Sequence, residues 1–167
     1  FADFQCPFCN RVQPTLESLL QEFGGRVQLV WRDYPLPFHQ NAKPAAILAM
    51  EAFEQGGADK FWEVHDLLFE NQRALARADL ERYAEQAGLN MAQVRAALDN
   101  EEHMDVIGAD QRLAQSLGAR GTPAFFINGR QLMGAQPFER FDALVREELA
   151  LAQEAGADPS TWYATLL

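Results

Sequence analysis

The sequence predicts one α/β domain in which a β-α-β segment and a β-β-α segment are separated by a large all-helical insertion. Three observations predict this order. A β-rich stretch follows the first helical pattern, helical periodicity then continues over about residues 39–118, and an Asn-Gly pair lies between two short apolar runs. A chain of 167 residues that is 48% hydrophobic can bury the core of one such domain.

The first segment is predicted to contain a strand, a helix and a second strand. Phe1–Phe4 is expected to be the end of a strand that is truncated by the start of the chain. Pro7 suits the first turn of a helix, where its missing N–H has no partner to lose, and Gly24-Gly25 ends that helix. Arg26–Tyr34 is short and rich in β-branched and aromatic residues, so it predicts the second strand.

The insertion is predicted to consist of several helices, each with an apolar face at helical spacing. Asp79 is a candidate N-cap, and Asn90 with Gln93 resembles a capping pair, so two helices are expected to begin there. Gly118 is expected to end the last helix. The residues expected to be buried are Ala42, Ala46, Ala49, Phe53, Phe61, Val64, His65, Leu68, Leu80, Tyr83, Ala84, Ala87, Val106, Ala109, Leu113 and Leu117.

The segment after the insertion is predicted to form a hairpin and a final helix. Pro123–Ile127 and Arg130–Met133 are the expected strands, joined by a type I′ turn at Asn128-Gly129, which accepts positive φ at both positions. The last helix is expected to start near Pro137. Its predicted buried face consists of Phe138, Phe141, Val145 and Leu149.

Composition limits both the domain boundaries and the function. No shift in composition marks a linker, so residues 1–157 are predicted to be a single domain and residues 158–167 a C-terminal tail. The net charge of −10, from 24 acids and 14 bases, argues against nucleic-acid binding, because phosphates require clustered Lys and Arg. No apolar run reaches the ~18 residues of a membrane span, and no signal peptide is visible in the chain.

The two cysteines, Cys6 and Cys9, are separated by two residues and lie between the first strand and the first helix. Unpaired N–H groups and the dipole at a helix start favour a thiolate, so Cys6 is a candidate nucleophile. One helical turn brings Cys9 back beside Cys6 in a better shielded position, which suits a thiol that resolves a mixed disulfide. The position of the pair therefore favours disulfide exchange.

Two other interpretations of the cysteine pair stay open, a structural pair without reactivity and a zinc site. Zinc takes four ligands, and the three histidines, His39, His65 and His103, lack ligand spacing, so no metal is expected. His65 lies on the apolar stripe of its helix and is expected to be a hydrogen-bonded core residue and not a catalytic one.

Gly121-Thr122-Pro123, directly before the predicted hairpin, is a second candidate part of the site. Proline cannot donate to a sheet, so Pro123 can simply initiate the strand. It can equally be a cis-proline beside the cysteines, since cis peptide bonds are almost confined to X-Pro. The local pattern alone does not choose between these two interpretations.

Together, the motifs resemble the DsbA-like thiol:disulfide oxidoreductases of the thioredoxin superfamily. The resemblance covers Phe1 to about Leu149. The segments that carry it are F-Q-C-P-F-C at 4–9, R-D-Y-P-L-P-F-H-Q-N-A at 32–42, F-W-E-V-H-D-L-L-F at 61–69 and G-A-R-G-T-P-A-F-F-I-N-G at 118–129. The resemblance implies a thioredoxin-like fold with a helical insertion, an exposed nucleophile at Cys6 and a resolving thiol at Cys9.

The resemblance also implies a substrate site and partners. Thr122 would pair its backbone with the substrate chain, and a cis-Pro123 would face the disulfide. Pro7 and Phe8 are further expected substrate contacts, and an apolar surface there suits unfolded clients. Protein thiols and disulfides would be the substrates, with a redox partner protein, no dissociable cofactor and an extracytoplasmic location.

Two features depart from the family pattern. Strongly oxidising members carry a histidine between the cysteines, whereas this chain has Pro7 and Phe8, so a weaker oxidant is expected. The buried acid of the family lies six residues before the first cysteine, a position that precedes Phe1. Asp3 is nearer, but it is expected to be a strand-end or surface acid.

Two rival functions remain. One is a redox-sensing or binding module of a larger protein, such as a transporter, that uses the same fold without turnover. The other is an isomerase of the glutathione-transferase kappa type, which shares the fold but lacks the C-x-x-C pair and therefore ranks last.

Overall fold

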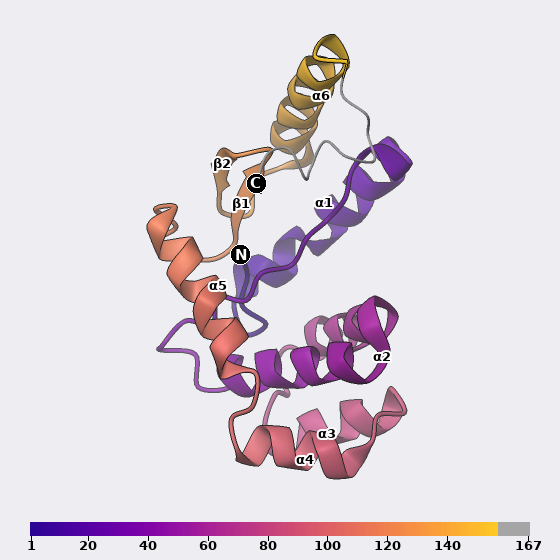
Figure 1. Ribbon diagram of the computed structural model, residues 1–167, viewed down its shortest axis with the longest axis vertical. Coiled ribbons are helices and arrows are strands. Elements are labelled where there is room, and N and C mark those ends of the chain that lie inside the picture. The colour runs from indigo at the N-terminus through magenta and orange to yellow at the C-terminus, as the bar shows by residue number, and fades with distance from the viewer. Residues whose placement is uncertain (157–167) are drawn as a thin grey trace.

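A computed structural model describes residues 1–156 of the chain. It shows the predicted order of helices and hairpin, with a large helical insertion between the first helix and the hairpin (Figure 1). The elements are α1 (Pro7–Phe23), a 3-10 turn (Gly24–Arg26), α2 (Ala42–Glu70), α3 (Arg77–Gln86), α4 (Met91–Asp99), α5 (Met104–Ser116), β1 (Ala124–Ile127), β2 (Arg130–Met133) and α6 (Phe138–Glu154). The predicted tail, residues 158–167, lies outside the described residues, so the predicted domain boundary stays a prediction.

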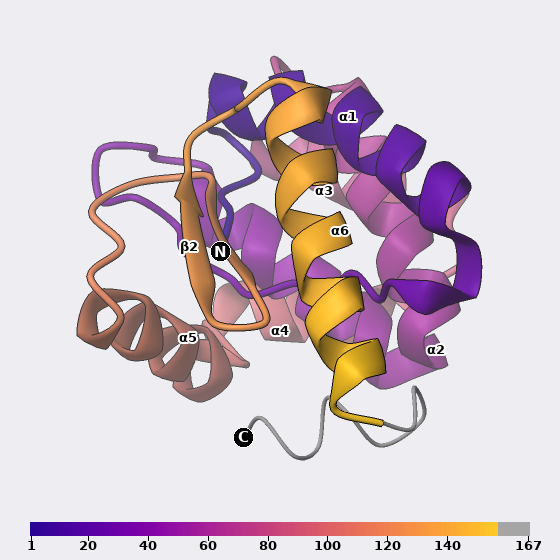
Figure 2. The same cartoon turned by 90° about the horizontal axis from the view of Figure 1, so that it is seen from above.

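The hairpin of β1 and β2 forms as predicted and lies between two helical layers. Its strands are antiparallel, with Ala124 opposite Met133, and both residues of the Asn128-Gly129 turn have positive φ. Because strand side chains alternate, Phe125 and Ile127 pack with α1 and α6, whereas Ala124 and Phe126 pack with α5 and Tyr34. Figures 1 and 2 show α6 and the hairpin beside α1, at the end away from α2, α3 and α4.

The predictions of strands at Phe1–Phe4 and Arg26–Tyr34 are wrong, because neither segment forms a regular strand. They share a single parallel bridge between Ala2 and Asp33, and Phe1 exchanges two backbone hydrogen bonds with Ala124. The chain turns at Phe4, directly after Asp3, so few residues are available for pairing. Residues 28–31 belong to no helix or strand and have no backbone hydrogen-bond partner among residues 1–156.

The helical insertion packs as its own apolar core, and α1 begins at its edge. Aromatic and aliphatic side chains of α2, α3 and α4 form one cluster, which also contains Phe4, Cys6 and Cys9. Asn90 caps α4 as predicted, accepting from the N–H groups of Ala92 and Gln93. Among residues 1–156, no helix is both long enough and apolar enough to cross a membrane.

Three details of the insertion differ from the prediction. Phe53, expected on the buried face of its helix, is 49% accessible. Asp79 is not the N-cap of α3 but lies inside its first turn, where its carboxylate accepts from the N–H of Ala76. The predicted buried stripe of α5 is exposed, with Val106, Leu113 and Leu117 each at least 40% accessible. The opposite face is buried through Ile107, Asp110 and Ala114.

Hydrogen bonds explain why α5 turns this face inward. Asp110 accepts from Arg32 at 2.9 Å and from the backbone N–H of Asp33 at 3.0 Å. Gln111 donates to the carbonyl of Pro35 at 2.9 Å. These polar contacts, and not the apolar stripe, fix the rotation of the helix.

Candidate active site

Cys6 lies where the chain changes from an extended segment to a helix. It is the N-cap of α1, with φ −73° and ψ 119°, and Pro7 follows at the first helical position. The carbonyl of Asp3 accepts from the N–H of Cys6, and the carbonyl of Cys6 accepts from the N–H of Cys9 at 3.0 Å. The start of α1 therefore places the N–H groups of Phe8 and Cys9 near the Cys6 sulfur, as the sequence predicts.

Both cysteines are free thiols, and both are buried. Cys9 is inaccessible and Cys6 is only 3% exposed, so the expectation that Cys6 is exposed is wrong. The two residues between them are exposed instead. Phe8 is 49% accessible, and the Arg11 guanidinium lies 4.9 Å from the centre of its ring.

The Gly121-Thr122-Pro123 loop lies directly against Cys6, although 116 residues separate Thr122 from it in the chain. The Cys6 sulfur lies 3.4 Å from the Thr122 carbonyl oxygen, to which the protonated thiol can donate, and the Thr122–Pro123 peptide bond is cis. The Thr122 hydroxyl is buried and has no hydrogen-bond partner of normal geometry among the described residues. A thiolate at Cys6 is the acceptor that this hydroxyl can stabilise.

The two thiols differ strongly in acidity. A hydrogen bond from Cys9 is the main effect that lowers the pKa of Cys6 from its ordinary 9.0 to about 5. The Thr122 hydroxyl and the N–H groups of Phe8 and Cys9 lower this pKa further, whereas burial opposes them. Burial raises the pKa of Cys9 far above its ordinary value, and the neighbouring Cys6 adds to this effect. Cys6 is thus a thiolate at neutral pH while Cys9 keeps its proton.

Asp3 is a buried acid that the sequence assigned only to a strand end or the surface. Its side chain is inaccessible, accepts from the N–H groups of Gln5 and Leu36, and lies 2.7 Å from Nδ1 of His39. Its own N–H points at the Cys9 sulfur, 3.5 Å away. The expectation of a strand-end or surface acid is therefore wrong, and the hydrogen bonds of Asp3 tie the cysteine turn to the segment before α2.

Asp33 is a second buried acid, which the sequence analysis missed. One carboxylate oxygen accepts from the Trp31 indole at 2.8 Å, and the other has no partner among residues 1–156. Burial raises the pKa of Asp33 to about 7. Its position in a β-rich stretch gave no sign of burial, because an acid in a strand is usually solvent-facing.

His65 is a core residue, as predicted. Five aromatic rings surround it, its Nδ1 lies 2.8 Å from Asp66, and burial lowers its pKa. An uncharged imidazole surrounded by aromatic rings contributes to packing. Within residues 1–156, His65 forms no hydrogen bond with Cys6.

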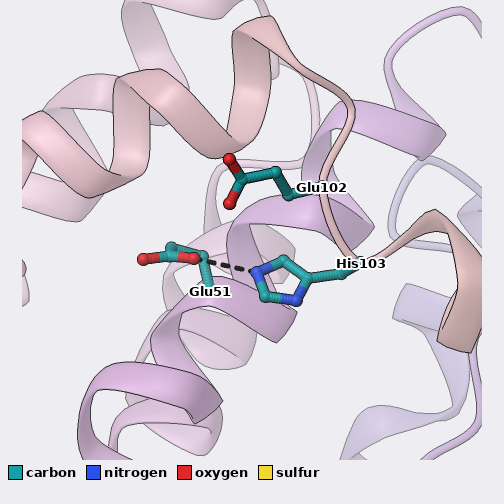
Figure 3. Close-up of side chains that lie close together, drawn as sticks. All are labelled: Glu51, Glu102 and His103. Atoms are coloured by element: carbon teal, nitrogen blue, oxygen red, sulfur yellow. Dashed lines mark hydrogen bonds and ion pairs between the residues drawn. The ribbon is translucent and has the colours of Figure 1, made fainter.

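One group of possible metal ligands lies elsewhere, at the contact of α2 with the loop before α5 (Figure 3). Ligand atoms of Glu51, Glu102 and His103 lie within 4.8 Å of one another. His103 already bonds Glu51 at 2.8 Å, and Gln55 donates to the other oxygen of Glu51 at 2.7 Å. The bonds to Glu51 explain why these side chains lie close together, since they join α2 to the loop before α5. Neither cysteine belongs to this group.

Comparison with known proteins identifies the family. A family model described as DSBA-like thioredoxin domain matches residues 1–146. The chain belongs to this family. In fold it is similar to a thioredoxin-like oxidoreductase from Silicibacter pomeroyi, with a TM-score of 0.77 and 26% identity over 87% of this chain and 82% of that one. A periplasmic thioredoxin-like protein from Salmonella enterica serovar Typhimurium gives a TM-score of 0.74 at 24% identity, over 90% and 82% of the two chains.

Among curated proteins, the chain is similar to part of larger proteins. It is 39% identical to the Na(+)/H(+) antiporter NhaA 3 of Salinispora tropica over 95% of this chain and 24% of that protein. It is 37% identical to the Na(+)/H(+) antiporter NhaA 1 of Salinispora arenicola over 90% of this chain and 22% of that protein. The chain thus spans about a quarter of the length of these relatives.

Proposed function

We propose that this DsbA-like domain is a thiol:disulfide oxidoreductase that exchanges disulfides with protein substrates through Cys6 and Cys9. The observation that carries the proposal is the placement of two free thiols at the start of α1, with the cis Thr122–Pro123 bond directly against Cys6, and the pKa values of the two thiols support it. Cys6, with a pKa of about 5, is present as the nucleophile, whereas Cys9 stays protonated until a mixed disulfide has formed.

The exchange reaction proceeds in two balanced steps. In the reducing direction, the Cys6 thiolate attacks a client disulfide, so a Cys6–client bond forms and the other client sulfur leaves as a thiolate. Cys9 then loses its proton and attacks the Cys6 sulfur, which forms the Cys6–Cys9 disulfide and releases the second client thiolate. The client gains two electrons and the protein loses two.

The acidity of Cys6 favours the reverse direction, the oxidation of a client dithiol. A stabilised thiolate stabilises the reduced protein relative to its disulfide, which makes the disulfide a better oxidant. Phe8 supplies no charge or hydrogen bond between the cysteines, so this stabilisation is smaller than in members with a histidine there.

Clients would bind over the exposed residues beside the buried sulfurs. Phe8 offers apolar surface, and Phe38, which is 72% accessible, offers more of it in the loop before α2. Such surface suits a protein that exposes its own core. Thr122 and Pro123 would hold the client backbone against Cys6, since the carbonyl of Thr122 already lies next to the sulfur. Electrons would pass to a redox partner protein outside the cytoplasm, where disulfides persist.

The test is turnover with a reduced, unfolded disulfide protein. With oxidised glutathione in excess to regenerate the Cys6–Cys9 disulfide, catalytic amounts of the domain should accelerate disulfide formation in the client beyond the rate with glutathione alone. Cys6→Ser should abolish the acceleration, and Cys9→Ser should accumulate a mixed disulfide on a non-reducing gel. A wild-type protein that acts only stoichiometrically, with no acceleration beyond one equivalent, would refute the proposal.

A second candidate is a redox module of a membrane transporter. The observation that favours it is that curated relatives are named Na(+)/H(+) antiporters, of which this chain matches about a quarter. In that case, the disulfide state of Cys6 and Cys9 would bias ion exchange by the attached membrane part. Ion flux in vesicles that contain the whole transporter should then change with oxidation and become insensitive to it in Cys6→Ser.

A further inference from the structure

The loop after α2 reaches back to the turn that carries Cys6. Gln72 is separated from Cys6 by 66 residues, yet its amide Nε2 donates to the Cys6 carbonyl at 2.8 Å and to the Phe4 carbonyl at 2.8 Å. A carboxamide has two N–H donors, so both are used on the same turn. The two carbonyls lie on either side of the peptide bond between Gln5 and Cys6.

A second side chain fixes the orientation of Gln72. Asn10, one helical turn after Cys6, donates to the Gln72 side-chain oxygen at 3.4 Å and to the Phe69 carbonyl at 3.0 Å. The backbone N–H of Gln72 donates to the same Phe69 carbonyl at 3.3 Å. The end of α2, the start of α1 and the cysteine turn are thus joined by one hydrogen-bonded network.

This network controls the part of the backbone on which the chemistry of Cys6 depends. The direction of the Cys6 side chain, and its distance to the N–H groups of Phe8 and Cys9, follow from the backbone angles of the N-cap residue. Those angles are restrained when the carbonyls before and after the peptide bond are both held. A donor that bonds two carbonyls across one residue supplies that restraint.

We propose that Gln72, in the loop directly after α2, is a positioning residue that holds the backbone turn at Cys6 in place. This inference rests on the proposed function of Cys6. Gln72 touches no reacting atom. It keeps the Cys6 sulfur within reach of the helix-start N–H groups and of the Thr122 loop, so its loss makes the thiolate less stable.

The experiment compares two glutamine variants in the whole chain. Gln72→Met keeps the length and volume of the side chain but removes the donors. Gln111→Met is the matched control, because Gln111 is also half-buried, also in the insertion, and also donates to a distant backbone carbonyl, that of Pro35, away from the cysteines. The readout is the pH dependence of Cys6 alkylation, with thermal melting recorded in parallel.

We expect Gln72→Met to raise the pKa of Cys6 and to lower its alkylation rate at pH 5 by about threefold or more, the effect of losing roughly one net hydrogen bond. Gln111→Met should leave the titration unchanged. A Gln72→Met protein that melts at a lower temperature but titrates like the wild type would overturn the inference, since a merely structural role predicts that result.

Two further measurements keep the inference falsifiable. If Gln72→Met does not fold, Asn10→Ala is tested instead, because it removes the contacts of Asn10 to the Gln72 oxygen and to the Phe69 carbonyl but leaves the Gln72 amide in place. This variant should shift the Cys6 titration in the same direction by a smaller amount, and no shift would contradict the inference. Absence of turnover with a client protein in the wild type would instead refute the proposed function, while the Cys6 titration of the variants would still report on positioning.

Discussion

The hydrogen bond from Cys9 to Cys6 can be tested by two substitutions at one position. Cys9→Ala removes the donor, whereas Cys9→Ser keeps a hydroxyl that can still donate. Because this bond is the largest single effect that lowers the pKa of Cys6 to about 5, only the alanine variant should lose it. A hydrogen bond to a charged group contributes about 1.5–3 kcal/mol, so the pKa of Cys6 in Cys9→Ala should rise by about 1–2 units.

The assay is the absorbance of the thiolate near 240 nm as a function of pH, supported by alkylation rates. Wild-type Cys6 should be about 99% thiolate at pH 7, compared with about 1% for an ordinary cysteine. Cys9 should not interfere, since burial keeps it protonated. Equal Cys6 titrations in Cys9→Ala and Cys9→Ser would refute the reasoning, because the shift would then not depend on a donor at position 9.

Three other predictions follow from individual residues. Thr122→Val keeps the shape of the side chain but removes the hydroxyl, so the pKa of Cys6 should rise by up to about one unit; an unchanged titration would exclude the hydroxyl as a donor. Phe8→His should lower the pKa of Cys6 and raise the reduction potential measured against glutathione, and a lower potential would contradict the account of this position. Asp33→Asn concerns stability. Since the folded pKa of about 7 lies above the unfolded 3.8, Asp33 stabilises the fold fully below about pH 4, and this contribution is lost as pH rises through 7. In urea unfolding, the free energy of unfolding of the wild type should therefore fall by up to about 4 kcal/mol between pH 4 and pH 8, relative to that of Asp33→Asn. A constant difference between the two proteins would show that Asp33 titrates normally.

The parts of the fold that depend on local chemistry could be predicted from the sequence. Pro7 marked the start of α1, Asn128-Gly129 marked the hairpin, and Asn90 marked the cap of α4. In each case, the residue type acts on its own backbone or on that of near neighbours. The cysteine pair could be found in the same way, because a C-x-x-C at a helix start is a local arrangement.

The predictions that failed concern features that depend on residues far along the chain. Arg26–Tyr34 has strand-forming residues, but a strand needs a paired neighbour, and within residues 1–156 only Ala2 provides one. The face of α5 was predicted from its apolar stripe, whereas hydrogen bonds of Asp110 to Arg32 and Asp33 decide it. Gln72 lies in a loop with no periodicity, so its role depends on contacts that no spacing reveals.

The helical insertion therefore forms part of the proposed site around Cys6 and Cys9. The start of α1 supplies N–H groups that stabilise the Cys6 thiolate, but the low pKa of Cys6 also needs a protonated neighbour. Cys9 keeps its proton because it is buried, and the core in which it is buried is the one built by α2, α3 and α4. The insertion thus keeps Cys9 a donor, which in turn keeps Cys6 a thiolate. A thioredoxin-like hairpin and helix alone would leave Cys9 more solvated, and the difference in acidity between the two thiols would be smaller.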